Sequence, residues 1–182
     1  MPQLFNDLIL SVTDRIKATN TSVVLAESCT AGLVSACLSR TPGISQILCG
    51  SAVVYQEATK SAWLGVSPSL LASDGAVSEK VASAMAVGVL ERTPAANLSA
   101  SITGHLGPGA PSEQDGLIYV GIARRTSQGC EVSIFRHVLP AEIGQAPLAG
   151  VESLREWRQW KAVEVVLNHL LQALPTGDQQ RN

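Results

Sequence analysis

Short apolar segments rich in Val, Ile and Leu alternate along this chain with segments in which apolar residues recur every three or four positions. The strand-like segments are residues 23–26, 47–55 and 98–103. The helical segments are residues 3–18, about 30–40, about 58–64, one opened by Ser67-Pro68, one opened by Ser78-Glu79, and 151–174. Alternation of this kind is typical of strands joined in parallel through helices, and it predicts an α/β fold.

Two further strand-like segments, residues 117–124 and 130–139, are separated by a turn-like sequence that ends in Gly129. They predict an antiparallel hairpin at one edge of the sheet. Together with the alternating segments, this hairpin predicts a three-layer α/β/α sandwich around a mixed, mainly parallel sheet. We expect one domain at residues 1–174 and a frayed tail at residues 175–182.

The composition excludes several classes of protein. Hydrophobic residues make up 46% of the chain and charged residues 15%, which is typical of a globular domain and not of a disordered one. The net charge of −2 argues against nucleic acid or an anionic membrane as a partner. The N-terminus lacks the basic segment of a signal peptide, and the longest apolar run is too short to span a bilayer. We therefore expect a soluble, cytoplasmic protein.

The positions of cysteine and histidine do not match known metal-binding patterns. No two cysteines form a C-x-x-C pair, and the histidines are far apart in the sequence: Cys29, Cys37, Cys49, Cys130, His105, His137 and His169. We expect reduced thiols and no structural zinc or other metal site.

Hydroxyl and thiol side chains crowd the junction between the strand at residues 23–26 and the helix that follows, where the sequence reads Glu27-Ser28-Cys29-Thr30-Ala31-Gly32. These side chains are suited to capping the helix N-terminus. They are equally suited to a ligand site, because a helix N-terminus after a strand binds anions readily. The glycine-rich loop after Thr103 follows another strand, so both segments should face the same crevice.

Lys60 lies in an otherwise apolar segment, SAVVYQEATKSAWLG, close to Tyr55. Lysines are usually solvated, and that interpretation stays open here. A desolvated lysine, however, acts as a general base towards a serine hydroxyl, and a Ser/Lys dyad is a known variant of the catalytic triad. The sequence offers no convincing Ser–His–Asp arrangement.

Three blocks of the sequence together carry a resemblance to a known family. They are AESCT at residues 26–30, Y-x4-K-x3-LGV at residues 55–66 and GAVSE at residues 75–79. The chain resembles, over roughly residues 25–174, the C-terminal domain of competence/damage-inducible protein A. That family includes stand-alone nicotinamide-nucleotide amidohydrolases, also called NMN deamidases. The resemblance implies a three-layer domain that hydrolyses the carboxamide of nicotinamide mononucleotide to nicotinate mononucleotide and ammonia, without a metal or another cofactor.

The resemblance also implies site residues, and two serines compete as nucleophile. Ser45 is favoured because it lies in a loop that leads to the strand before Tyr55 and Lys60. Lys60 would then be the base and Tyr55 would orient it. Ser28 and Thr30 would contact the substrate or the oxyanion. If Ser28 is the nucleophile instead, the two serines exchange roles.

Three further residues complete the expected site. Thr103 belongs to the family pattern, and backbone N–H groups near Gly104 are candidates for stabilising an oxyanion. Arg155, in the final helix, would hold a phosphate or carboxyl group of the ligand, with a solvated arginine as the alternative.

The loop after Thr103 departs from the family pattern. Relatives usually continue with Ile-Ala-Gly-Pro, a Gly-Gly-Ser/Thr segment and Lys-Pro, whereas this chain reads TGHLGPGAPSEQDG. His105 replaces an apolar residue and is either an additional acid/base or a surface residue. The altered loop leaves two other functions open, namely a protein that binds a nucleotide-like ligand without turnover and a hydrolase of a different amide.

Trp157 and Trp160 are unusual in the final helix of this family. They would cover the core, shape a pocket or form a subunit contact. These tryptophans and the small-residue helices favour a homo-oligomer, such as a homodimer. The expected partner is a small-molecule substrate.

Overall fold

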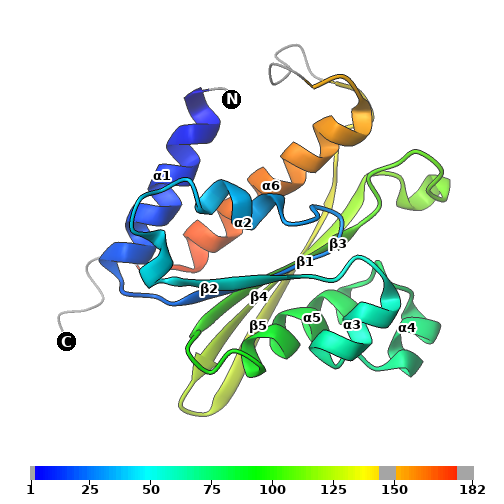
Figure 1. Ribbon diagram of the computed structural model, residues 1–182. Coiled ribbons are helices and arrows are strands. Elements are labelled where there is room, and N and C mark those ends of the chain that lie inside the picture. The colour runs from blue at the N-terminus through cyan, green and yellow to red at the C-terminus, as the bar shows by residue number, and fades with distance from the viewer. Residues whose placement is uncertain (1–2, 144–150, 176–182) are drawn as a thin grey trace.

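The computed structural model describes residues 3–143 and 151–175 (Figure 1). The α-helices are α1 (Gln3–Ala18), α2 (Leu33–Leu38), α3 (Glu57–Leu64), α4 (Pro68–Asp74), α5 (Glu79–Glu91) and α6 (Leu154–Ala173). The strands are β1 (Val23–Glu27), β2 (Leu48–Val53), β3 (Leu98–Gly104), β4 (Leu117–Thr126) and β5 (Gly129–Val138). Two 3₁₀ helices, η1 (Ile44–Gln46) and η2 (Ser112–Gln114), lie in connections.

The described strands form one five-stranded sheet in the order β2-β1-β3-β4-β5. Strand β1 pairs in parallel with β2 and with β3, whereas β4 is antiparallel to β3 and β5 is antiparallel to β4. The predicted mixed sheet and its antiparallel hairpin edge are therefore confirmed. The register pairs Glu27 with Val53 on one side and with Ile102 on the other, so the carboxyl ends of three strands meet at one edge.

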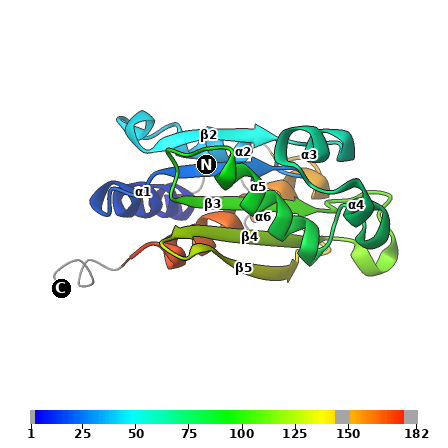
Figure 2. The same cartoon turned by 90° about the horizontal axis from the view of Figure 1, so that it is seen from below.

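Helices cover both faces of the sheet, which confirms the three-layer architecture. Helices α1, α2 and α6 lie on one face, and α3, α4 and α5 lie on the other (Figures 1 and 2). Alternate residues of β1 serve the two layers, because Leu25 packs in the core beneath α1, α2 and α6 whereas Val24 packs in the core beneath the other three helices. A strand buried on both faces reads as a continuous apolar run, as residues 23–26 do.

Helix α5 packs tightly against β3 and α3. The hydroxyls of Ser99 and Ser101 donate to the carbonyls of Ala86 (2.7 Å) and Ala82 (2.6 Å), so the strand bonds directly to the helix. At Gly88, a Cβ atom would collide with the carbonyl of Leu64 in α3. The absence of a side chain at Gly88 therefore lets α5 approach α3 closely.

Helix α2 begins later than predicted. The sequence pattern predicts a helix from about residue 30, but α2 starts at Leu33. Ala31 and Gly32 have φ angles of 52° and 93°, which a right-handed helix does not accommodate. The residues between β1 and α2 therefore form a turn.

The C-terminal end of α1 lies beside the end of α6, because Arg15 in α1 donates to the carbonyl of Pro175 (3.1 Å). The other residues of the predicted tail, 176–182, lie outside the described residues. No helix in the described part of the chain is long and apolar enough to cross a membrane.

Candidate active site

The site lies where the carboxyl ends of β1, β2 and β3 meet. Just beyond the strands, the Ser28 N–H donates to the Ile102 carbonyl (3.0 Å), and the Val54 N–H donates to the Glu27 carbonyl (2.8 Å). These two bonds extend the parallel pairing by one residue. Ser28 is therefore held by the sheet, immediately before the turn that leads into α2.

Lys60 reaches this edge from α3. Its Nζ atom donates to Ser28 Oγ (2.9 Å) and to the Val54 carbonyl (2.8 Å), and the residue is only 1% exposed. Burial lowers the pKa of Lys60, because it removes the ammonium group from water. The predicted desolvated lysine is thus present, and the serine beside it is Ser28.

Ser45 lies at the other end of β2. It is exposed in η1, which precedes the strand, whereas the Val54 carbonyl that binds Lys60 follows the strand. Six residues of β2 separate the two positions, a rise of roughly 20 Å. The structure does not bring Ser45 to Lys60, contrary to the expectation that the two form a dyad.

Cys29, next to Ser28, is a second candidate nucleophile by residue type. Burial raises the pKa of its thiol to about 12. Because the thiolate is the nucleophilic form, a thiol that stays protonated at neutral pH is inert. The arrangement therefore favours the serine hydroxyl.

Glu27 organises the turn between β1 and α2, although sequence patterns do not single it out. Its carboxylate accepts from Thr30 Oγ1 (2.8 Å), from Ser51 Oγ (3.0 Å) and from the backbone N–H groups of Val34 and Ser35 (3.0 Å each). The carboxylate thus caps α2, where a negative charge is favourable. An acidic residue just before a hydroxyl-rich turn and a helix is the signal that would have found it.

Thr30 is held within this arrangement. It is 1% exposed, and its hydroxyl donates to Glu27. Its carbonyl accepts from the side chain of Gln159 in α6 (3.2 Å). Among the described residues, no backbone carbonyl accepts a hydrogen bond from the N–H groups of Cys29 and Thr30.

A cavity of about 270 Å³ opens beside Ser28 and Lys60. Its lining comes from the turn after β1, the α3 region, the segment before α5, the loop after β3 and α6: Ser28, Cys29, Tyr55, Lys60, Ala76, Val77, Thr103, Gly104, His105, Leu106, Gly107, Pro108, Gly109, Ala110 and Arg155. Six of the eight predicted catalytic and binding residues line this cavity, and Ser45 and Thr30 do not.

Three of the lining residues have distinct environments. Thr103 is 1% exposed and its hydroxyl donates to the Ala76 carbonyl (2.7 Å), which ties β3 to the segment before α5. Gly104 is packed so closely that a Cβ atom would overlap with Ile118 and the Leu117 carbonyl. His105 is half-buried, so it is a cavity residue and not a fully exposed one.

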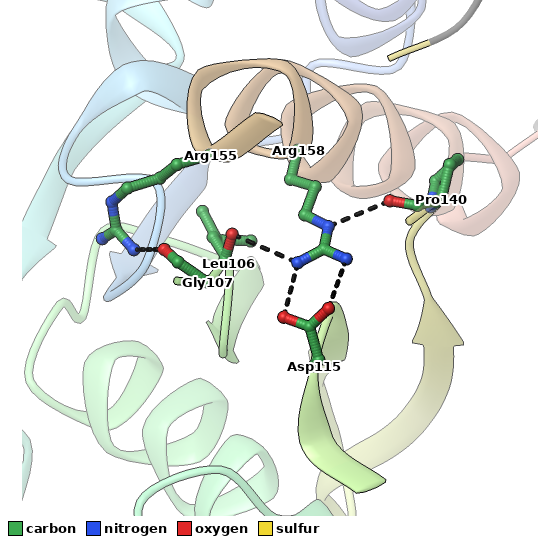
Figure 3. Close-up of polar contacts among 6 residues, drawn as sticks. All are labelled: Leu106, Gly107, Asp115, Pro140, Arg155 and Arg158. Carbon is green, nitrogen blue, oxygen red and sulfur yellow. Dashed lines mark hydrogen bonds and ion pairs between the residues drawn. The ribbon is translucent and has the colours of Figure 1, made fainter. Parts of the chain in front are cut away.

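Tyr55 and Arg155 meet at the rim of the cavity. The Tyr55 hydroxyl accepts from Arg155 Nη2 (2.7 Å), and Arg155 Nη1 donates to the Gly107 carbonyl (2.5 Å; Figure 3). Tyr55 therefore contacts Arg155, whereas the family resemblance implies that it orients Lys60. The two residues are 100 positions apart in the sequence, so no local pattern predicts the contact.

A second cavity, of about 630 Å³, adjoins the first. The two share the segment 106–110 and Arg155. Arg158 is not among the residues that the sequence predicts for the site, and of these two cavities it lines only the second, together with Asp115. Within the described residues, no group of three or more His, Cys, Asp or Glu side chains is arranged to hold a metal ion.

The two tryptophans of α6 pack against other parts of the molecule, Trp157 buried and Trp160 half-buried. Trp157 is buried, with Lys161 Nζ 5.0 Å from its ring centroid. Trp160 packs edge-on against Phe5 of α1, with ring centroids 5.4 Å apart. Neither lines either of the two cavities, so of the three expected roles they do not shape these pockets.

Comparison with known proteins gives a consistent family. A family model described as the CinA C-terminal domain matches residues 6–156. A CinA-like protein of Chlorobium phaeovibrioides is 41% identical over 126 residues, which cover 67% of this chain and 29% of that protein. A CinA-like protein of Desulfotalea psychrophila is 34% identical over 151 residues, which cover 83% of this chain and 34% of that protein. The chain thus spans about a third of the length of these curated relatives.

Solved structures share the fold over nearly the whole chain. The competence/damage inducible protein CihA from Agrobacterium tumefaciens superposes with a TM-score of 0.80 and 28% identity, covering 94% of this chain and 96% of that one. The competence damage-inducible protein A (ComA) from Klebsiella pneumoniae gives a TM-score of 0.80 at 22% identity, covering 93% and 96%.

Proposed function

Because the chain belongs to the CinA C-terminal domain family, we propose that it is a serine amidohydrolase of the nicotinamide-nucleotide type. Its substrate is nicotinamide mononucleotide, and its products are nicotinate mononucleotide and ammonia. The observation that carries this proposal is the 2.9 Å contact between Lys60 Nζ and Ser28 Oγ beside a cavity. A desolvated lysine in contact with a serine hydroxyl is the arrangement that activates serine in Ser/Lys hydrolases.

We assign the nucleophile to Ser28. Its hydroxyl contacts Lys60 and lines the cavity, whereas Ser45 is exposed at the far end of β2. The Val54 carbonyl accepts a second hydrogen bond from Lys60 and so fixes the direction of the amine.

In the first half of the reaction, neutral Lys60 takes the proton of Ser28 while Ser28 Oγ attacks the amide carbon. The backbone N–H groups of Cys29 and Thr30 stabilise the negative charge on the amide oxygen, an effect typically worth about 3–4 kcal/mol per donor. The Lys60 ammonium then gives its proton to the amide nitrogen, the C–N bond breaks, and ammonia leaves.

In the second half, water replaces ammonia. Neutral Lys60 takes a proton from this water as the water oxygen attacks the acyl-enzyme ester. The Lys60 ammonium then returns a proton to Ser28 Oγ as the C–O bond of the ester breaks. Arg155 binds the anionic group of the substrate at the rim, where it lines both cavities. No step requires a metal or another cofactor.

Ammonia release from nicotinamide mononucleotide by the purified protein tests this function. The Ser28→Ala and Lys60→Met variants should lose at least about a thousandfold in kcat, because each removes one member of the dyad. Ser45→Ala is the matched control and should keep wild-type turnover, since that exposed serine lies far from Lys60.

The other outcomes separate the alternatives. Loss of turnover in Ser45→Ala but not in Ser28→Ala would return the nucleophile to Ser45. Binding of the nucleotide without ammonia release would identify a binding protein, and hydrolysis of another amide with the same Ser28 and Lys60 dependence would change the substrate alone. The expected homo-oligomer and cytoplasmic location stay predictions, the former measurable by light scattering.

A further inference from the structure

Arg158 is a charged side chain that is only 1% exposed. Its Nη1 and Nη2 atoms donate to the two carboxylate oxygens of Asp115 (2.7 Å each), and its Nε atom donates to the Pro140 carbonyl (2.9 Å). A longer bond reaches the Leu106 carbonyl (3.4 Å; Figure 3). A buried guanidinium is stable only when its donors are satisfied, and here the acceptors are three residues from two segments of the chain.

All these acceptors except Pro140 belong to one loop, residues 105–116, which we call the wall loop. Its two ends are joined by the bond from the Gly116 N–H to the His105 carbonyl (3.0 Å). Beyond that bond, Arg155 and Arg158 attach the loop to α6 by binding the successive carbonyls of Gly107 and Leu106. Two arginines three positions apart on one helix face therefore donate hydrogen bonds to the same stretch of backbone.

The backbone of the wall loop is shaped around the ion pair. Gly107 has a φ angle of 70°, and a Cβ atom there would lie 3.0 Å from both Arg158 Nη1 and Asp115 Oδ1. At Gly116, with φ at 77°, a Cβ atom would lie 2.8 Å from the Leu139 carbonyl and 3.4 Å from the Arg158 guanidinium. Glycine at these two positions lets the chain close over the pair.

The ion pair between Arg158 and Asp115 also determines which charges the wall loop presents to a ligand. The hydrogen bonds from Arg158 lower the pKa of Asp115, so this carboxyl is ionised at neutral pH and neutralises the buried guanidinium. Asp115 therefore does not present an unpaired negative charge to an anionic ligand. Arg155 carries the positive charge that is common to both cavities.

We propose that the Arg158–Asp115 pair is a positioning element that holds the wall loop against α6 and so sets substrate affinity at the cavity of Ser28 and Lys60. Neither partner lines that cavity, whereas Leu106 and Gly107, which the two arginines hold, do. The pair thus acts through the loop. The effect on substrate rests on the proposed function, but the effect on the loop does not.

The test compares Asp115→Asn, Arg158→Met and the double variant with Glu113→Gln, an exposed acidic residue of the same loop, as the matched control. Hydrogen–deuterium exchange of residues 106–114 should become faster in all three variants of the pair and stay unchanged in Glu113→Gln. The double variant should recover thermal stability relative to Asp115→Asn, because Asp115→Asn leaves the buried guanidinium of Arg158 without its counter-charge and the double variant does not. It should not recover loop protection.

Affinity and turnover are measured separately. With Ser28→Ala added to prevent turnover, the Kd for nicotinamide mononucleotide measured by calorimetry should rise about tenfold in Asp115→Asn. With Ser28 present, kcat should change by less than about threefold, because the dyad is untouched. Glu113→Gln should leave both values unchanged.

Unchanged hydrogen–deuterium exchange in Asp115→Asn would overturn the proposal. It would also be overturned if exchange became faster in Asp115→Asn while its Kd for the nucleotide stayed equal to that of the Glu113→Gln control. If Arg158→Met does not fold, Asp115→Asn carries the test, since its side chain is 40% exposed and the substitution keeps its size. A wild-type protein that does not bind the nucleotide would refute the proposed substrate, while the exchange measurement would still decide the positioning role.

Discussion

Lys60 Nζ lies 2.9 Å from Ser28 Oγ, although the two residues are 32 positions apart in the sequence and belong to different layers of the fold. Lys60 is almost completely buried, and its second hydrogen bond goes to a backbone carbonyl, not to a carboxylate. An amine in these surroundings gives up its proton more easily than a solvated lysine does.

The pH dependence of hydrolysis should report the Lys60 base. Burial lowers the pKa of Lys60, and only the neutral amine accepts the serine proton. We expect kcat/KM to rise with pH and to level off above a midpoint below the ordinary lysine pKa of about 10.4. The same profile in His105→Gln is the control, because His105 lines the cavity. A rise that disappears in that variant would assign the base to the imidazole instead.

Replacement of Lys60 by Met should stabilise the fold at neutral pH. Because the pKa of Lys60 is lower in the folded state, the unfolded chain binds more protons between the folded and unfolded pKa values, and wild-type stability rises with pH across that window. The difference in free energy of unfolding between Lys60→Met and wild type should therefore be largest below the lowered pKa of Lys60 and shrink as the pH approaches about 10. Urea unfolding from pH 7 to 10 measures it.

Lys17→Met is the control for this measurement, because Lys17 is an exposed lysine on α1. The difference in free energy of unfolding between wild type and Lys17→Met should not shrink in this way as the pH rises. A constant difference between wild type and Lys60→Met over the whole range would contradict the prediction.

Removal of the Glu27 carboxylate should destabilise the protein. Glu27→Ala leaves two hydroxyls and two backbone N–H groups without their acceptor, and loss of the acceptor of buried donors is costly. We expect the free energy of unfolding to fall by about 3 kcal/mol, with a smaller loss in Glu27→Gln. Urea unfolding compares these variants with Glu131→Ala, an exposed residue of β5. Equal stability of Glu27→Ala and the control would rule out this role.

Arg155 should govern affinity for the anionic group of the substrate. Arg155→Ala removes the guanidinium that lines both cavities, and we expect the KM for nicotinamide mononucleotide to rise at least about tenfold with a smaller change in kcat. Nicotinamide riboside, which lacks the phosphate, should be hydrolysed equally by wild type and variant.

Arg136→Ala, an exposed arginine of β5, provides the matched control for loss of a positive charge. An equal rise in KM for both substrates would show that Arg155 acts through the shape of the wall loop and not through its charge.

The sequence alone was sufficient for the order of helices and strands, the three layers and the antiparallel hairpin. These features follow from local periodicity and from glycine and proline at the ends of elements, which act over a few residues. It also pointed to Lys60, because a lysine in an apolar segment is unusual. The late start of α2 was not predicted. The positive φ angles at Ala31 and Gly32 accompany a cap from the Glu27 side chain, and the spacing of apolar residues carries no sign of such a cap.

Only the tertiary structure decided which side chains meet. The register of β1 with β2 places Val54, and therefore Lys60, beside Ser28, and it leaves Ser45 at the opposite end of the strand. The contacts of Arg155 with Tyr55 and of Arg158 with Asp115 join residues 100 and 43 positions apart. Such contacts depend on how the layers pack around a shared core, and residue type and spacing do not encode that packing locally.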